Sequence, residues 1–291
     1  MSKFEKINEF LETLQNEQNN RSIPEFEGYS PTEMLFVVYD PFGDNSPLQL
    51  LELSNADYSQ IPIFNQIRYL LQLINESEEL KLTAKSFLPP KIVADIYNQK
   101  FIKEELIESG VSKLYRESAS KSINLTRILL ELSGLVKKRN KKLSLTPKGK
   151  EALNKHYKLL RSIVITFGTK FNWAYYDGCG QNDIGQLGFG FSLILLNKYG
   201  SEKRPESFYG KKYLKAFPSL LEQIKPSRYY TTKEEEFYQC YSLRTFKRFL
   251  SYFGLIEIDA GDKWDAEKFI KKTVLFDKLI KIQPHTSKYA S

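Results

Sequence analysis

The sequence has very little cysteine or histidine, with two residues of each among 291. Cys179 and Cys240 are far apart and lack the spacing of a metal-binding motif, and His156 and His285 are isolated. A disulfide framework and a zinc or histidine-based metal centre are therefore not indicated. We expect both cysteines to be free and mostly buried thiols in a reducing cytoplasm, and we expect no cofactor.

Long apolar runs are also missing. The longest apolar clusters, such as residues 193–196, fit a protein core and fall well short of the roughly 20 residues of a membrane helix. Residues 1–14 are amphipathic and acidic, and they lack the basic start and apolar centre of a secretory signal. We therefore expect a cytoplasmic protein that does not contact a membrane.

Recognisable catalytic motifs are absent from the sequence. The glycine turn at 178–180 lacks the third glycine of a dinucleotide loop, and no Gly-Lys-Ser/Thr follows. Asp177 and Asp183 flank this turn, and Glu79 stands two residues before Lys81, but such pairs arise by chance in a chain rich in Glu and Lys. We expect no enzyme, with a metal-dependent nuclease as the remaining catalytic alternative.

Charge is distributed unevenly along the chain, whose net charge is +8. Residues 1–60 hold 3 basic and 11 acidic residues, whereas residues 61–160 hold 19 basic and 10 acidic ones. Residues 161–291 hold 21 and 14. A basic centre and C-terminal half favour a nucleic-acid partner, and a lysine-rich genome composition is the alternative explanation.

The most informative block is 122–159. An amphipathic helix ends at Gly134, a strand leads into a basic turn over 137–142, and a strand returns over 143–145. Thr146-Pro147 then predicts the start of a helix over 148–159. This block resembles a winged-helix (helix-turn-helix) domain, and residues 145–153 (LTPKGKEAL) are similar to the segment after the wing in many bacterial regulators. Residues 101–116 could supply the preceding helices.

The resemblance implies a nucleic-acid-binding surface. The wing would contact phosphates, while the preceding helix, residues 124–132, would read bases with Arg127 as its clearest candidate. The same helix would present Asn124, Thr126 and Glu131 on its polar side. The alternative is a solvated basic turn in a purely structural winged helix. The basic residues expected to bind nucleic acid, besides Arg127, are Lys137, Lys138, Arg139, Lys141, Lys142, Lys148 and Lys150.

A related pattern follows near the C-terminus. An apolar helix face over 243–253 ends at Gly254, and a strand over 255–258 leads into a turn at 259–262 and a second segment from Trp264. We interpret this as a second winged-helix-like unit and a weak internal repeat of the first. Its hairpin is acidic and would repel phosphate, which favours packing or protein interaction; the acidic residues are Glu257, Asp259, Asp262 and Asp265.

Between the two patterns lies an aromatic and glycine-rich segment. We expect its glycines to form tight turns, and its aromatic residues Phe171, Trp173, Tyr175 and Tyr176 to pack in the core, with base stacking as the alternative. Helices are expected over 191–199 and 211–221, besides those over 3–15, 31–39, 63–74 and from Pro90. The whole layout resembles that of bacterial proteins, some carried on plasmids or phages.

These patterns together predict a mainly α fold with short β-hairpins, in which winged-helix-like units are embedded in a helical protein. We expect non-enzymatic binding of nucleic acid, duplex DNA above all, in a bacterial regulatory, mobile-element or defence setting. The alternative is a protein-interaction scaffold in which the acidic first segment and the winged helices bind partner subunits. The expected segments are 1–60, 61–100, 101–160, 161–226 and 227–291.

Overall fold

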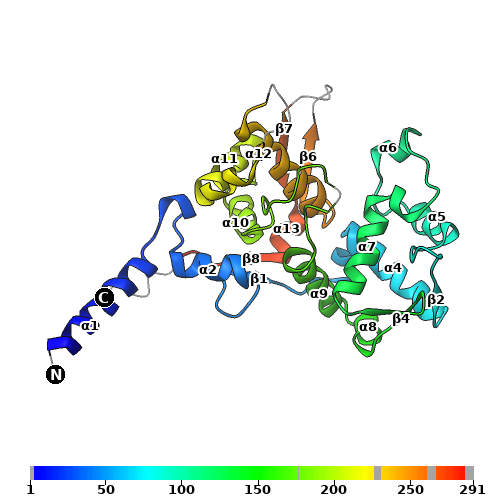
Figure 1. Cartoon of the computed structure of the whole chain (residues 1–291), viewed down its shortest axis with the longest axis horizontal. Helices are drawn as coiled ribbons and strands as arrows, with labels where there is room; N and C mark the ends of the chain where they lie inside the picture. The colour runs from blue at the N-terminus through cyan, green and yellow to red at the C-terminus, as the bar shows by residue number, and fades with distance from the viewer. Residues whose placement is uncertain (1–2, 176, 226–230, 261–266, 286–291) are drawn as a thin grey trace. The chain divides into compact units, whose positions relative to one another are not determined.

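The computed structural model describes residues 3–175, 177–225, 231–260 and 267–285 (Figure 1). The chain is mainly α-helical with small antiparallel sheets, which confirms the expected fold class. It divides into two compact units. The first comprises Met1–Leu51, Trp173–Phe249 and Ile256–Ser291, and the second comprises Glu52–Asn172 and Leu250–Leu255. Among the described residues, no helix is both long and apolar enough to cross a membrane.

The second unit is a helical bundle with one small sheet. Its central helix packs against α4, α5 and α9, and most of its side chains from Ser122 to Leu130 are buried. In chain order the elements are α3 (Asn55–Tyr58), α4 (Pro62–Glu76), β2 (Leu80–Lys81), α5 (Pro90–Asn98), α6 (Glu105–Glu108), the 3₁₀ turn Glu117–Ala119, the central helix α7 (Lys121–Leu132), β3 (Val136–Arg139), β4 (Lys142–Leu145), α8 (Pro147–Leu153) and α9 (His156–Thr169).

The sheet of the second unit is antiparallel, in the order β2-β4-β3. Val136 pairs with Leu145, and Arg139 pairs with Lys142, so the β3–β4 hairpin is closed by a two-residue turn. The turn residues Asn140 and Lys141 have φ of 50° and 56°, as in a type I′ turn, which suits the right-handed twist of paired strands. The basic turn expected over 137–142 is therefore shorter than predicted, because most of its residues belong to the strands.

The first unit contains the chain's N-terminal helices, a second three-stranded sheet and a two-stranded pairing of β1 with β8. Its elements are α1 (Lys3–Asn20), the 3₁₀ turn Pro24–Phe26, α2 (Pro31–Tyr39), β1 (Leu48–Leu50), α10 (Phe189–Tyr199), β5 (Arg204–Pro205), α11 (Glu206–Ala216), the 3₁₀ segment Pro218–Gln223, α12 (Lys233–Tyr241), the π-helix η4 (Ser242–Leu250), β6 (Ile256–Ala260), β7 (Lys268–Lys272), α13 (Val274–Leu279) and β8 (Ile280–Ile282).

Both units repeat one order of elements. In the second unit, helix α4, strand β2, helix α5 and helix α7 precede the β3–β4 hairpin. In the first unit, helix α10, strand β5, helix α11 and the α12–η4 helix precede the β6–β7 hairpin, and its sheet order β5-β7-β6 matches β2-β4-β3. Gly134 and Gly254 both have φ of 69° where the last helix ends. The internal repeat is therefore longer than the sequence pattern indicated.

Several helix boundaries agree with their local signals. Ser30 caps α2, whose bounds match the helix expected over 31–39, and Glu33 completes a capping box. Helix α10 ends at Tyr199, the last residue of the helix expected over 191–199.

Other boundaries differ from the expectations. Helix α1 continues beyond its expected end at residue 15 to Asn20. The expected helix over 148–159 is broken between α8 and α9, and Pro218 ends the helical run expected over 211–221. Residues 101–116 supply only the single turn α6. Trp264 lies outside the described residues.

The two units also regroup the five expected segments. Segments 61–100 and 101–160 share one core in the second unit, because α7 packs against both α4 and α5. The N-terminal residues up to Leu51 join the C-terminal segments, since α2 contacts α10 and β1 pairs with β8.

Candidate nucleic-acid interface and the buried arginines

The β3–β4 hairpin carries basic side chains and no acidic one. Lys137, Lys138, Arg139 and Lys141 are exposed, and Lys142 is half-buried. Because successive residues of a strand point to opposite faces, Lys137 and Arg139 share one face and Lys138 lies on the other. The structure therefore brings the five predicted wing residues together on one solvent-exposed hairpin, which we call the basic hairpin.

Neighbouring carboxylates neutralise part of this charge. Lys142 Nζ lies 2.5 Å from Glu79 Oε2, and Lys138 Nζ lies 3.4 Å from Glu131 Oε2. Lys142 holds the pKa of Glu79 below its usual value through a hydrogen bond. Within the described chain no ion pair involves the three remaining residues, Lys137, Arg139 and Lys141, which can thus contact an external anion without first breaking an internal contact.

The other two predicted basic residues lie on α8. Lys148 and Lys150 are both exposed, and Lys148 Nζ donates to the Ser133 carbonyl at 2.8 Å. This bond ties the start of α8 to the end of α7. Lys148 is therefore partly engaged within the second unit, whereas Lys150 is available to solvent.

Arg127 does not occupy the position expected for a base-reading residue. Its side chain is 9% exposed, and Nε donates to Glu117 Oε1 at 2.7 Å while Nη1 donates to Glu131. Burial by itself would lower the pKa of Arg127, but the two carboxylates outweigh it and raise the pKa. The prediction that Arg127 approaches a groove is therefore wrong for this structure, because the guanidinium is enclosed and neutralised.

Glu117 is the centre of this buried network. Its carboxylate is fully enclosed and accepts hydrogen bonds from the Leu88 backbone N–H and from Asn124 Nδ2, in addition to Arg127. Asn124 and Thr126 are likewise buried. The polar side of α7 thus faces the interior of the second unit, and the base-reading surface expected on this helix is absent from its described side chains.

The corresponding hairpin of the first unit has mixed charge. Glu257 pairs in register with Lys271, and Asp259 on β6 receives a salt bridge from Lys203 at 2.6 Å. Strand β7 also carries Lys268 and Lys272. Asp262 and Asp265 lie outside the described residues. The acidic side chains on β6 therefore sit beside basic ones, which the local sequence pattern did not indicate.

A second buried arginine organises the glycine-rich loop of the first unit. Arg244 is fully buried, and its Nε lies 2.5 Å from Asp177 Oδ2. Its other nitrogens donate to the carbonyls of Gly180, Asn182 and Ile184. One guanidinium thus holds the loop in place through several carbonyls. The expected tight turns are confirmed, since the glycines at 178, 180, 185 and 188 have positive φ.

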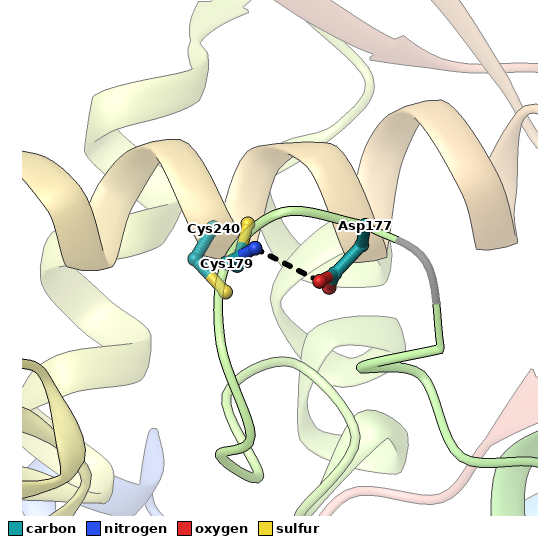
Figure 2. A group of neighbouring side chains, drawn as sticks. All are labelled: Asp177, Cys179 and Cys240. Carbon is teal, nitrogen blue, oxygen red and sulfur yellow. Dashed lines mark hydrogen bonds between the residues drawn. The ribbon is translucent and has the colours of Figure 1, made fainter. Parts of the chain in front are cut away.

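The loop brings Cys179 close to Cys240 of α12. Figure 2 shows the loop with Asp177 and Cys179 running beside the helix that carries Cys240. The two sulfurs and a carboxylate oxygen of Asp177 lie within 4.8 Å of one another. Cys240 is buried and Cys179 is half-buried, and both thiols are free. Sequence spacing did not predict this cluster because 60 residues separate the two cysteines.

These three side chains could offer two sulfur ligands and one oxygen ligand to a soft cation. Both oxygens of Asp177 already have partners, however, because Oδ1 accepts from the Cys179 N–H at 2.9 Å and Oδ2 faces Arg244. A guanidinium at this distance opposes the binding of another cation. The contacts therefore favour a pair of interacting thiols over a metal site.

Two of the remaining aromatic candidates pack in the core. Phe171 and Trp173 are buried, and the ring of Trp173 packs at a tilt against Phe249 with centroids 5.3 Å apart, which confirms core packing for both. Tyr175 is 38% exposed, and Tyr176 lies outside the described residues.

His156 packs edge-on against Tyr58 and Phe64, while His285 Nδ1 lies 2.6 Å from Glu33 Oε2. Within the described residues, neither histidine is hydrogen-bonded to a serine or cysteine side chain.

Comparison of the chain with family models, curated proteins and solved structures finds no match.

Proposed function

We propose that the chain binds nucleic acid without catalysis, with duplex DNA as its main ligand, through the basic hairpin. The observation that carries this proposal is the exposure of Lys137, Arg139 and Lys141 on a hairpin free of acidic residues. Lysine and arginine that neutralise phosphates release condensed counterions, which provides most of the affinity for nucleic acid. We infer a winged helix from the order α4-β2-α5-α7-β3-β4 and the sheet order β2-β4-β3, and this inference supports the proposal.

The mode of binding is contact with the phosphate backbone. Because Arg127, Asn124 and Thr126 are buried, α7 offers little to the edges of bases. We therefore expect similar affinity for unrelated sequences. A cytoplasmic bacterial protein of a regulatory, mobile-element or defence system fits this mode.

Fluorescence anisotropy of a labelled random duplex, measured at two salt concentrations, tests the proposal. Three neutralised phosphates give a slope of log K against log salt of about −2.7, so affinity should fall roughly 40-fold between about 50 and 200 mM salt. Changing the five basic residues of the hairpin, 137–139, 141 and 142, to Gln should remove most binding and flatten the slope.

A matched control separates the hairpin from net charge. Changing five exposed lysines elsewhere in the second unit to Gln removes the same charge and should leave most of the affinity; these are Lys85, Lys91, Lys103, Lys113 and Lys121. If both variants lost affinity for the duplex to the same extent, the loss would be due to overall charge and not to the basic hairpin. Absence of binding by the native chain at low salt would overturn the proposal.

The second candidate function is that of a protein-interaction scaffold. It is favoured by the burial of the polar side of α7 and by the apolar side chains that α1 exposes to solvent. A scaffold would show weak salt dependence and no affinity for duplex. The salt titration of the native chain therefore discriminates between the two functions.

A further inference from the structure

Helix α1 exposes its apolar side chains. Phe4 is 78% exposed, Phe10 62%, Leu11 55%, Ile7 49% and Leu14 38%. Five large apolar side chains on one helix form a contiguous patch of the kind that soluble proteins use for association. Within the described part of the first unit, no other element therefore buries this apolar face of α1.

The spacing of these residues is that of a coiled coil. Phe4, Ile7, Leu11 and Leu14 follow one another at intervals of 3, 4 and 3 residues, which are the a and d positions of two heptads. Phe10 widens the stripe at the adjoining g position. A face that is narrow and periodic in this way suits another helix lying alongside better than a concave pocket.

We propose that α1 is a self-association surface that pairs antiparallel with α1 of a second copy of the chain. When the two apolar stripes overlap fully, Phe4 of one copy is level with Leu14 of the other, and Ile7 is level with Leu11. The pairing is isologous, because the same surface is used by both copies and the assembly closes as a dimer.

Charge selects the second copy and its orientation. The second half of α1 carries Glu12 and Glu17 and no basic residue. A parallel pair would place these carboxylates level with their counterparts, whereas an antiparallel pair places them level with the first half of the other helix. That first half holds as many basic as acidic residues, so it repels the two carboxylates less than a second acidic half would. Charge complementarity of this kind fixes partner and orientation more than it adds affinity.

The positions that flank the stripe also suit this arrangement. In an antiparallel pair, g positions meet g positions and e positions meet e positions. Near the two-fold axis Phe10 meets Phe10 of the second copy, and Asn8 meets Asn8. Neither contact opposes like charges, so no unfavourable pair has to be desolvated at the centre of the interface.

The macrodipole of α1 gives an independent reason for this orientation. The last turn contains no basic residue, and Glu17 adds negative charge near the C-terminal end, where carbonyl groups are unsatisfied. An antiparallel partner brings the positive end of its own dipole to that position. Two heptads form a small interface, so the association should be weak and depend on concentration.

Sedimentation equilibrium of the full chain between about 1 µM and about 1 mM tests the proposal, since weak dimers populate this range. The native chain should shift from monomer to dimer. Changing Ile7 and Leu11 to Asp should abolish the shift, while changing Thr13 and Asn16 to Asp adds the same charge outside the stripe and should preserve it. A native chain that stays monomeric throughout, or an equal loss in the control, would overturn the proposal.

Cysteine cross-linking tests the orientation. Under oxidising conditions, a mixture of Phe4→Cys chains and Leu14→Cys chains should give the mixed disulfide dimer, and the native chain should give none. A homodimer of Leu14→Cys chains formed more readily than the mixed dimer would show parallel pairing and overturn the antiparallel arrangement. Duplex affinity of each variant, measured separately, distinguishes failure of this proposal from failure of the nucleic-acid function.

Discussion

Arg127 Nε donates to Glu117 Oε1 at 2.7 Å inside the second unit, where both side chains are shielded from solvent. Removing one member of a buried ion pair leaves the other charge without compensation, which typically costs about 3–5 kcal/mol. Arg127→Gln should therefore lower the free energy of unfolding by about this amount, measured by urea denaturation.

The same variant separates a structural role from a reading role. Without urea, and at a temperature at which the Arg127→Gln variant is folded, its affinity for a random duplex should equal that of the native chain. The double variant Arg127→Met/Glu117→Met should be more stable than Arg127→Gln, because no buried charge remains. A loss of affinity without loss of stability would restore Arg127 as a nucleic-acid contact.

Glu27 gives a pH-dependent prediction in the first unit. Burial raises its pKa, but hydrogen bonds from Lys198, Lys212 and Tyr199 outweigh burial and lower it. A depressed folded pKa means that the carboxylate stabilises the fold above its unfolded pKa and that this contribution is lost as pH falls through the folded value.

Glu27→Gln should therefore destabilise the chain by about 1–2 kcal/mol near neutral pH, since Lys198 is half-exposed and screened by water. The difference from the native chain should vanish at acidic pH below the folded pKa. Thermal melts over a pH series measure this. A difference that stays constant down to the acid limit would contradict the assigned role of the carboxylate.

Cys179 should react with iodoacetamide before Cys240. A hydrogen bond from Cys240 lowers the pKa of the Cys179 thiol, with Arg244 and Arg248 adding to the effect, whereas the same bond and burial raise the pKa of Cys240. Because the thiolate is the nucleophile, the alkylation of Cys179 should reach its maximum rate at lower pH than an ordinary thiol.

Mass spectrometry of partially alkylated protein gives both rates. Cys240→Ala removes the hydrogen bond and should shift the rate profile of Cys179 to higher pH. An unshifted profile would assign the lowered pKa to the arginines alone.

Gly134 and Gly254 occupy equivalent positions in the repeated order of elements. Each takes φ of 69°, a conformation that disfavours residues with a Cβ. A Cβ at Gly134 would meet no atom within 4 Å, so the cost there is conformational. Either glycine changed to Ala should lower stability by about 1 kcal/mol, and Asn should cost less because it tolerates this region. Chemical denaturation of the four variants compares them.

Local signals in the sequence predicted elements whose stability is also local. The end of α7 at Gly134 and the start of α8 after Thr146 involve residues within a few positions of each other. The exposed charge of the basic hairpin was predictable for the same reason, because a short two-stranded hairpin has no core of its own in which its lysines could be buried.

The predictions that failed depend on distant residues. Arg127 looks like a surface residue in the helical pattern, but Glu117, ten positions earlier, lies in a turn that folds over α7. The meeting of Cys179 and Cys240 depends on Arg244, which gathers several carbonyls of the loop. Hydrophobic periodicity predicts which face of one helix is apolar. It does not predict which carboxylate from a distant part of the chain neutralises a buried charge on that helix.

Gly149 in the first turn of α8 has a consequence for genetics. A Cβ at this position would lie 2.0 Å from the carbonyl oxygen of Leu135, a backbone atom that cannot rotate away. Since Leu135 leads into β3, the clash would fall on the support of the basic hairpin and leave its charge unchanged. An alanine allele at codon 149 should therefore give a temperature-sensitive phenotype. Raising the temperature would then inactivate the second unit in living cells.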